Sequence, residues 1–257
     1  MKYLVFQLYG PMASWGDIAV GESRHSHQSP TKTAIMGLVA AALGIKRDEE
    51  DLHQRLNTQY SMAVSVISRG KLLRDYHTTQ VPDSVGKFQY RTRRDELVLG
   101  KDRLAKGTIL SSREYRTEFQ LRVALTAEPD APYSLEQLNE ALNSPKFVLY
   151  LGRKSCPLAA PTAGQFIEAD GFLAAFSGYS ASGVFHAKGE RSSDWEARCL
   201  AVRDLPEYFW EGSPDDLDKN VDHSEIMSFT RHDRLLSRGR WQFAPQTIYR
   251  WQPTEGV

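Results

Sequence analysis

The chain has 257 residues, 41% of them hydrophobic and 25% charged, which is ordinary for a globular protein with one core or two small substructures. Lysine plus arginine and aspartate plus glutamate both total 32, so the formal net charge is zero. This balance excludes a general nucleic-acid binder, which would be basic overall. Any nucleic-acid site must therefore arise from a local arrangement of charge.

The cysteines and the hydropathy pattern indicate the compartment. Cys156 and Cys199 are too few for a disulfide scaffold and form no CxxC pair for zinc. The first residues turn polar too quickly for a signal peptide, and no apolar run approaches the length of a membrane helix. We expect a cytoplasmic protein with reduced thiols and no contact with a membrane.

The first third of the chain predicts one strand and two helices. Lys2–Tyr9 is rich in aromatic and branched residues and ends at Gly10-Pro11, which predicts a strand. Thr31 can cap a helix that stops at Gly44, a residue suited to the left-handed conformation. Asp48 is expected to cap a second helix that reaches about Tyr60.

The middle of the chain predicts strands around a long insertion. Met62–Arg69 alternates as a strand, and Leu72–Thr78 is expected to be its hairpin partner. Residues 79–112 lack sustained periodicity and carry many charges, as functional or disordered connections do. Glu114–Thr126 predicts a long strand. Its apolar residues fall largely on one face, namely Tyr115, Phe119, Leu121, Val123 and Leu125.

A further helix and strand complete a recognisable order. Ser134 and Gln137 form a capping box at the start of a helix that buries Leu135, Leu138 and Leu142, and Phe147–Leu151 is expected to be the next strand. The order strand, helix, strand, arm, strand, helix, strand predicts an α+β, ferredoxin-like (RRM-type) fold with an inserted arm.

The signal weakens after Ala159. Gly171–Ser193 looks loop-rich, and Glu196–Val202 and Trp241–Trp251 are candidate strands in a less regular, β-rich C-terminal part. The predicted division is a palm with its C-terminal extension, residues 1–78 and 113–257, and an inserted arm, residues 79–112.

Charge is segregated along the sequence. From Lys87 to Arg122 there are ten basic residues against five acidic ones, whereas Arg203 to Glu225 holds eight acidic and two basic residues. In the arm, arginines alternate with Phe88 and Tyr90, a composition that suits backbone tracking and base stacking as well as a solvated loop. The pattern predicts one face for a polyanion and another for solvent or a protein neighbour.

The most informative segment is Tyr150–Leu158. It combines an aromatic ring, a glycine and the adjacent cations Arg153 and Lys154 just after a predicted strand. Stacking on a base needs a π-face, and phosphates need cations and room to approach. A solvated strand end is the alternative interpretation.

Two other segments are candidate contacts. Lys32 lies at a predicted helix start, where free amides can bind a phosphate, although Thr31 can equally be a simple cap. In Arg74-Asp75-Tyr76-His77, His77 and Tyr76 beside a lysine could form a metal-independent ribonuclease site, or could simply pack.

No segment predicts a metal or cofactor. His25 and His27 lack an acidic or cysteine partner at a ligand spacing, and the acids Asp215, Asp216 and Asp218 lack the glycine and final glutamate of a calcium loop. Walker A and dinucleotide glycine patterns are missing.

Four segments in order resemble the CasD subunits, the type I-E members of the Cas-five family of CRISPR-associated proteins in the RAMP superfamily. These are Leu8–Gly16, Ser29–Thr33 with the helix to Ile45, Arg74–Thr78 and Tyr150–Leu158. The resemblance runs over roughly Tyr3 to Pro161. A glycine-rich loop near the C-terminus, common in the wider superfamily, has no counterpart among the scattered glycines here.

The resemblance implies an antiviral ribonucleoprotein subunit that is not an enzyme. Such proteins hold the 5′ handle of CRISPR RNA in Cascade, cap its backbone filament, and use the inserted arm as a thumb. The implied partners are the guide RNA, the backbone subunit CasC and the large subunit CasA, with target DNA reached only through the assembled complex. The expected RNA contacts are Lys32, Arg24, Arg74, His77, Arg113, Tyr150, Arg153 and Lys154.

Two other functions stay open from the sequence. A precursor-RNA endoribonuclease would use His77 and Tyr76, as the equivalent subunit of the type I-C branch does its own cutting. A ferredoxin-like protein for a small ligand is disfavoured by the basic arm.

Overall fold

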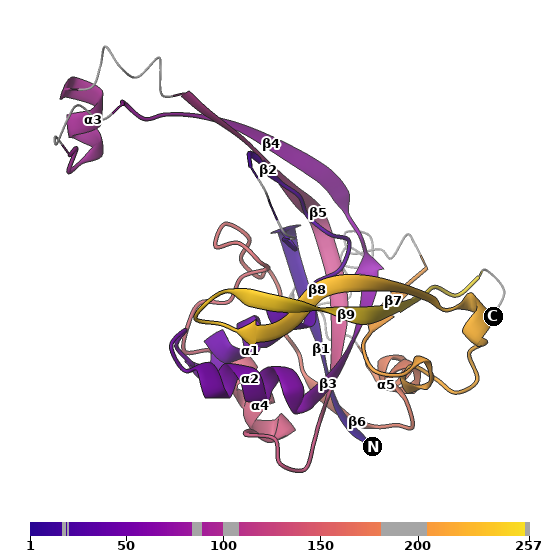
Figure 1. Ribbon diagram of the computed structural model, residues 1–257. Helices are drawn as coiled ribbons and strands as arrows, with labels where there is room; N and C mark the ends of the chain where they lie inside the picture. Colours follow the sequence, from indigo (N-terminus) through magenta and orange to yellow (C-terminus); the bar gives the residue numbers. More distant parts are fainter. Residues whose placement is uncertain (17–18, 20, 84–88, 100–107, 181–204, 255–257) are drawn as a thin grey trace, which may run out of the picture.

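The structure is a computed structural model that describes residues 1–16, 19, 21–83, 89–99, 108–180 and 205–254. It is a mixed α/β protein built on a large antiparallel sheet in the order β6-β1-β5-β3-β7-β9-β8, with β2 and β4 also pairing β5 (Figure 1). None of its described helices is long and apolar enough to cross a membrane.

The sheet is formed by strands from the whole length of the chain. Their bounds are β1 Lys2–Ala13, β2 Ser23–Arg24, β3 Tyr60–Ser68, β4 Lys71–Gln80, β5 Thr108–Ala127, β6 Gln165–Glu168, β7 Glu207–Trp210, β8 Met227–Ser237 and β9 Gln242–Trp251. The strands predicted at Lys2–Tyr9, Met62–Arg69, Glu114–Thr126 and Trp241–Trp251 are confirmed, although β3 is buried along most of its length and does not alternate.

Both faces of the sheet are covered. Helices α1 (Lys32–Leu43), α2 (Glu50–Thr58) and α4 (Leu135–Asn143) cover one face, and α5 (Phe172–Gly178) packs on the other. In β1, Leu4 and Phe6 enter the first core, whereas Tyr3 and Val5 enter the second, because successive strand side chains point to opposite faces. The five apolar residues predicted to share one face of β5 all lie in the first core.

The predicted helix ends are largely confirmed. Thr31 caps α1 by accepting a hydrogen bond from the amide of Ala34, and Gly44 ends it with φ +81°. Ser134 and Gln137 form the predicted capping box of α4. The prediction for α2 was wrong by one residue, because its N-cap is Glu49 and not Asp48.

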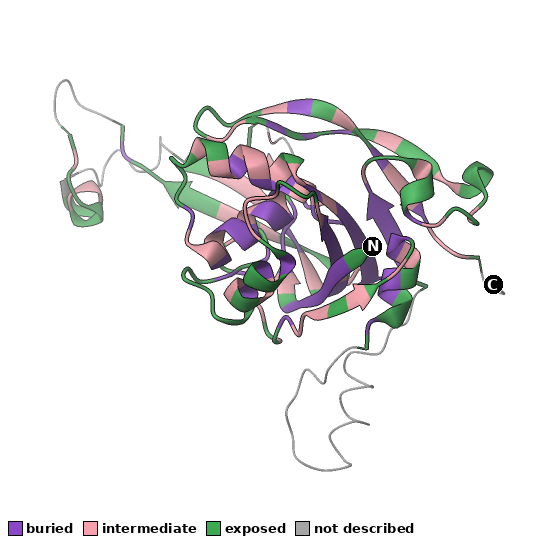
Figure 2. Cartoon of the chain, turned by 90° about the horizontal axis from the view of Figure 1, so that it is seen from below, coloured by how far each residue is buried: buried purple, intermediate pink, exposed green. Residues whose placement is uncertain are grey.

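An extended ribbon leaves the body of the molecule. β5 pairs with β3 through its second half and with β4 through its first half, from Lys71↔Thr117 to Gln80↔Thr108. The prediction that β4 pairs with β3 was therefore wrong. Both strands pair with β5, one after the other along its length. Helix α3 (Arg93–Leu99) lies at the far end of the ribbon (Figure 1). Buried residues concentrate in the body, and residues 93–98 of α3 are exposed or half-buried (Figure 2).

Three other predictions need comment. Phe147–Leu151 is not a strand: Phe147 and Val148 are exposed, and Tyr150 makes only an isolated bridge to Pro157. The strand that pairs with the free side of β1 is β6. The expected loop from Gly171 contains α5, and the candidate strand Glu196–Val202 lies outside the described residues, as does Cys199.

Candidate nucleic-acid interface

A groove of about 1170 Å³ opens between α1, the segment Val148–Arg153 and the β8–β9 hairpin. It exceeds the roughly 300–1,000 Å³ of a typical small-molecule pocket. Its lining is rich in cations and aromatic rings, and Asp233 is the acid among them. The basic side chains are Arg24, His27, Arg47, Arg153, Arg231, His232 and Arg238, and the aromatic ones are Trp15, Tyr150, Trp241 and Phe243. This combination can bind phosphates and stack on bases.

The segment Tyr150–Leu158 forms a tight loop against the end of β1. The amide of Leu151 donates to the carbonyl of Cys156 at 2.7 Å, and the amide of Ser14 donates to the carbonyl of Leu151 at 3.0 Å. Gly152 has φ +85°, and a β-carbon there would lie 1.8 Å from the carbonyl oxygen of Ser14. Only glycine therefore fits, and the loop is fixed to the sheet.

Within this loop the side chains divide between core and groove. Cys156 is fully buried in the first core, and burial raises the pKa of its thiol, as expected of a packing residue. Tyr150 is 37% exposed and lines the groove. Lys154 is exposed. The loop therefore presents a ring and cations to solvent, whether or not RNA binds them.

Arg153 is the most tightly oriented of the predicted phosphate contacts. Its Cζ lies 4.8 Å from the centroid of the Tyr115 ring, a cation–π contact. Its guanidinium donates to the carbonyl oxygens of Glu114 at 3.4 Å and Arg24 at 3.5 Å. These partners are neutral, so the positive charge of Arg153 remains available to an anion.

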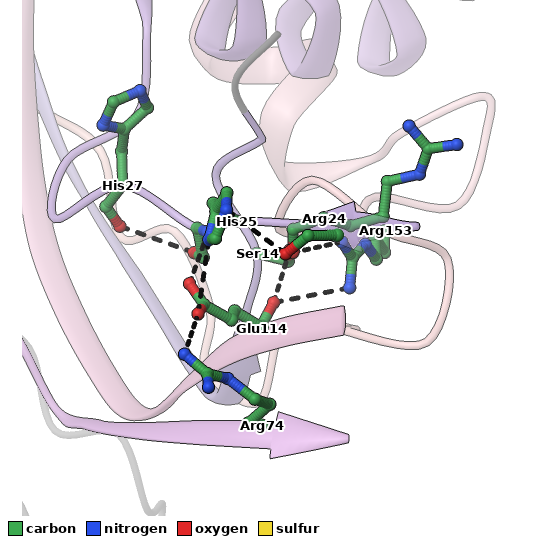
Figure 3. A network of polar contacts seen from close by, with 9 residues as sticks. Ser14, Arg24, His25, His27, Arg74, Glu114 and Arg153 are labelled. Atoms are coloured by element: carbon green, nitrogen blue, oxygen red, sulfur yellow. Dashed lines mark hydrogen bonds and ion pairs between the residues drawn. The ribbon is translucent and has the colours of Figure 1, made fainter. Parts of the chain in front are cut away.

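Glu114 is the centre of the polar network in Figure 3. Its buried carboxylate accepts hydrogen bonds from Arg74 at 2.9 Å and from the amide of Ser26 at 3.3 Å, and it lies 3.4 Å from Nδ1 of His25. Burial opposes ionisation, but the hydrogen bonds from Arg74, Ser26 and His25 together lower the pKa of Glu114. The carboxylate is thus held charged among cations.

The strand register brings further predicted residues to the same place. Arg113 on β5 lies opposite Arg24 on β2 and opposite Asp75 on β4, and its side chain is exposed. Arg74 lies opposite Glu114 in the same ladder. Arg24, Arg74, Arg113 and Arg153 thus come from neighbouring backbone positions where the ribbon joins the body, but the side chain of Arg113 points to the opposite face of β5 from Glu114 and Arg74. Of the four, Arg24 and Arg153 line the groove.

His77 lies farther along β4, away from that cluster. It forms a close ion pair with Asp75, and both side chains are more than 40% exposed. Tyr76 is 64% exposed on the other side of the strand. Neither makes a contact with a lysine in the described part of the chain, so the histidine, tyrosine and lysine suggested for ribonuclease chemistry are not brought together there.

The start of α1 is occupied by the protein's own acids. Lys32 Nζ lies 3.5 Å from Oε2 of Glu211, with only 13% and 16% of the two side chains exposed. The amide of Thr33 donates to Oδ2 of Asp233 at 3.2 Å. Burial raises the pKa of both Glu211 and Asp233. Lys32 stays a predicted RNA contact. To bind Lys32, an RNA phosphate would have to replace Glu211 in this ion pair.

One wall of the groove was missed in the sequence. Arg231, His232 and Arg238 come from β8 and the turn after it, and Trp241 and Phe243 come from that turn and β9. The run Arg238-Gly239-Arg240-Trp241 was a usable signal, because it places cations and an aromatic ring beside a glycine turn. Only the fold shows that this turn lies across from Tyr150–Leu158.

No group of three or more metal-ligating side chains occurs within the described ranges. His25 lies beside the carboxylate of Glu114 and belongs to its polar network. The cationic arm residues Lys87, Lys101, Arg103 and Lys106 lie outside the described part of the chain.

Comparisons with known proteins agree on one family. The model of the family described as CRISPR-associated protein (Cas_Cas5) matches residues 3–244. The "CRISPR system Cascade subunit CasD" of Escherichia coli (strain K12) is 33% identical over 165 residues, which cover 62% of this chain and 69% of that protein.

Solved structures share the fold. A chain from a "CRISPR RNA-guided surveillance complex" superposes with a TM-score of 0.60 at 21% identity, covering 97% of this chain and 89% of the other. A structure described as "Crystal structure of Cas protein" superposes with a TM-score of 0.55 at 22% identity, covering 97% and 94%. The family match includes β8 and the turn after it, which form part of one wall of the groove, and ends three residues into β9. The chain belongs to the Cas5 family of CRISPR-associated proteins.

Proposed function

We propose that this chain is a non-catalytic RNA-binding subunit of a type I-E Cascade complex, in which it holds the 5′ handle of the guide RNA and caps the backbone filament. The observation that carries the proposal is the groove of about 1170 Å³ in which cations and aromatic rings from three distant segments face one another. Single-stranded RNA is recognised by such a combination of phosphate contacts and stacking on splayed bases.

The architecture is consistent with a ferredoxin-like palm. The strands β6-β1-β5-β3 lie side by side, and α1 and α4 cover one face of them. The chain order β1, α1, β3, β5, α4, β6 supports a β-α-β-β-α-β connection in which β6 would be the last strand and α2 and β4 would be additions. The ribbon of β4 and β5 with α3 at its end would be the thumb, and its boundaries at residues 79–112 stay a prediction.

The partners of this subunit are proposed on the same basis. A relative is named as a Cascade subunit, so the guide RNA and the subunits CasC and CasA are the expected neighbours. Target DNA would be met only in the assembled complex. The acidic 3-10 turns Pro214–Asp216 and His223–Glu225 do not line the groove. We expect them to face solvent or a protein neighbour.

Binding of labelled RNA to the purified full-length chain tests the proposal. The probe is a single-stranded oligoribonucleotide with the repeat-derived sequence that precedes the spacer, and the control is the same sequence as a duplex. We expect preferential binding of the single strand, with an affinity that falls as salt rises. Equal binding of both forms, or no binding, would contradict the proposal.

The endoribonuclease alternative is separated by incubating the protein with repeat RNA in EDTA. We expect intact RNA from both wild type and His77→Ala, because His77 is paired with Asp75 on an exposed strand and does not line the groove proposed to hold the RNA. Site-specific cleavage by the wild type that disappears in His77→Ala would establish the ribonuclease instead.

A further inference from the structure

The turn between β8 and β9 carries a tryptophan that has two arginines within cation–π distance. Trp241 is 57% exposed. The Cζ of Arg238 lies 4.3 Å from its ring centroid and that of Arg47 lies 5.5 Å away. Phe243 supports the ring edge-on at 5.5 Å. All four residues line the groove, and the ring keeps more than half of its surface accessible after these contacts.

The two arginines place two positive charges close together, with the carboxylate of Glu50 beside Arg238. Burial lowers the pKa of Arg238 first, and the nearby cation Arg47 lowers it further. Glu50 is the nearest acid on α2, but its carboxylate oxygens accept hydrogen bonds from the backbone amides of Arg238 at 2.7 Å and Gly239 at 2.8 Å. The carboxylate thus anchors the turn, and an anion bound between the two guanidinium groups would relieve their repulsion.

The backbone of Trp241 is unusual for such a large residue. Its φ of +56° lies in the left-handed region, which glycine and asparagine adopt far more readily than a bulky side chain. The ring is also largely exposed, so core packing does not account for its presence. Strained residues of this kind concentrate at binding sites.

The opposite wall of the groove completes the arrangement. Tyr150 is 37% exposed, lines the groove and lies within electrostatic reach of Arg238. Two accessible rings and two cations therefore line the groove from three segments, because Tyr150 lies about ninety residues before Arg238 and Trp241 in the sequence and Arg47 lies about a hundred residues before Tyr150. A base with its phosphate offers the matching π-face and negative charge.

We propose that Trp241 is a base-stacking platform for one nucleotide of single-stranded RNA, and that Arg47 and Arg238 bind the phosphate of that nucleotide. The inference rests on the proposed function and adds a specific contact from the C-terminal hairpin. RNA is favoured over a protein partner because the ring lies in the same groove as Arg153, whose contacts within the described ranges are a tyrosine ring and two neutral carbonyl oxygens.

Binding of the single-stranded repeat-derived RNA by full-length variants tests the platform. Stacking contributes about 1–3 kcal/mol per base, so Trp241→Asn is expected to weaken binding about five- to hundredfold. Trp241→Phe should retain most of the affinity. Because asparagine tolerates the left-handed backbone, Trp241→Asn should keep or raise the melting temperature, which separates lost binding from lost folding.

The salt dependence tests the arginines. Arg47→Ala with Arg238→Ala should lower the slope of log affinity against log salt by about one unit for each lost phosphate contact, whereas Trp241→Asn should leave the slope unchanged. Two matched controls are expected to behave as wild type. Arg240→Ala removes a charge from the same turn outside the groove lining. Phe166→Ala removes an exposed ring of β6 that lies under the ammonium group of Lys2 and far from the groove lining.

The outcomes separate the two proposals. Wild-type binding that Trp241→Asn leaves unchanged would overturn the platform alone, and absence of wild-type binding would overturn the proposed function and the platform with it. If Trp241→Asn binds RNA normally but no longer assembles with the other subunits, the turn is a protein contact and the inference is wrong.

Discussion

Arg74 and Arg153, both near the place where the ribbon joins the body, are oriented by different kinds of partner. Arg74 is paired with the buried carboxylate of Glu114, whereas Arg153 is held by a tyrosine ring and two carbonyl oxygens. A phosphate would compete with Glu114 for Arg74. At Arg153 it would compete only with a tyrosine ring and two neutral carbonyl oxygens. Arg153 is therefore the stronger candidate of the two for a direct RNA contact.

Replacing Glu114 by glutamine is expected to destabilise the fold in a pH-dependent way. The lowered pKa of Glu114 means that its charged form stabilises the folded chain above the unfolded value of 4.5, and that this contribution is lost as the pH falls through the folded pKa. At pH 7 Glu114→Gln should cost about 1–3 kcal/mol of unfolding free energy.

Denaturant unfolding of Glu114→Gln at pH 7 and at successively lower pH measures this effect, with the exposed Glu128→Gln as the control. The gap from wild type should shrink below pH 4.5, the unfolded value of the carboxyl. A gap of constant size down to the pH of acid unfolding would contradict the role assigned to the charge.

Gly152→Ala is expected to displace the loop that carries Tyr150 and Arg153. The left-handed φ and the contact of the added β-carbon with the carbonyl of Ser14 predict a loss of at least about 2 kcal/mol in unfolding free energy, together with weaker RNA binding. Gly16→Ala is the matched control, because its β-carbon would meet nothing within 4 Å. Similar melting temperatures for the two variants would contradict this account.

At the level of elements, local sequence signals predicted helix ends better than strand partners. The caps Thr31 and Ser134 act within a few residues, so the chain specifies them locally. Phe147–Leu151 has the composition of a strand, but β6 pairs with that edge of β1 instead. The partner of β4 was mispredicted because β5, at 20 residues, is long enough to pair with β3 and β4 in succession.

The capping box of α4 gives a test of stability without binding. Ser134→Ala removes the hydrogen bond to the amide of Gln137, and should lower the free energy of unfolding by about 1 kcal/mol. Because α4 contributes nothing to the described groove lining, the RNA affinity should stay at the wild-type level. A parallel loss of affinity in a binding titration below the melting temperature would show that α4 is coupled to the groove.

At the scale of the whole molecule, the interface is an assembly of distant segments. Its three walls come from α1, from Val148–Arg153 and from the β8–β9 hairpin, and the hairpin is joined to α1 through Asp233 and to α2 through Glu50. Net charge is zero for the chain, so the attraction for RNA must come from cations brought together by the fold.

Removing Arg153 and Lys154 together tests this whole-molecule arrangement. The double alanine variant should bind the single-stranded repeat RNA more weakly, with a salt slope lower by about one unit for each lost phosphate contact. Lys219→Ala, an exposed cation outside the groove lining, is the control. An unchanged slope in the double variant would place the pair outside the RNA path.

The sequence by itself determined what depends on neighbours along the chain: the caps of α1 and α4, the apolar face of β5, the glycine turn with its cations after Tyr150, and the four ordered motifs that resemble a known family. Only the tertiary structure decided which cations remain available. It placed Glu211 beside Lys32, Glu114 beside Arg74, and Trp241 with Arg238 opposite Tyr150. The reason is physical: caps and turns are satisfied by hydrogen bonds within a few residues, whereas strand partners and charge pairs form between segments that only the folded sheet brings together.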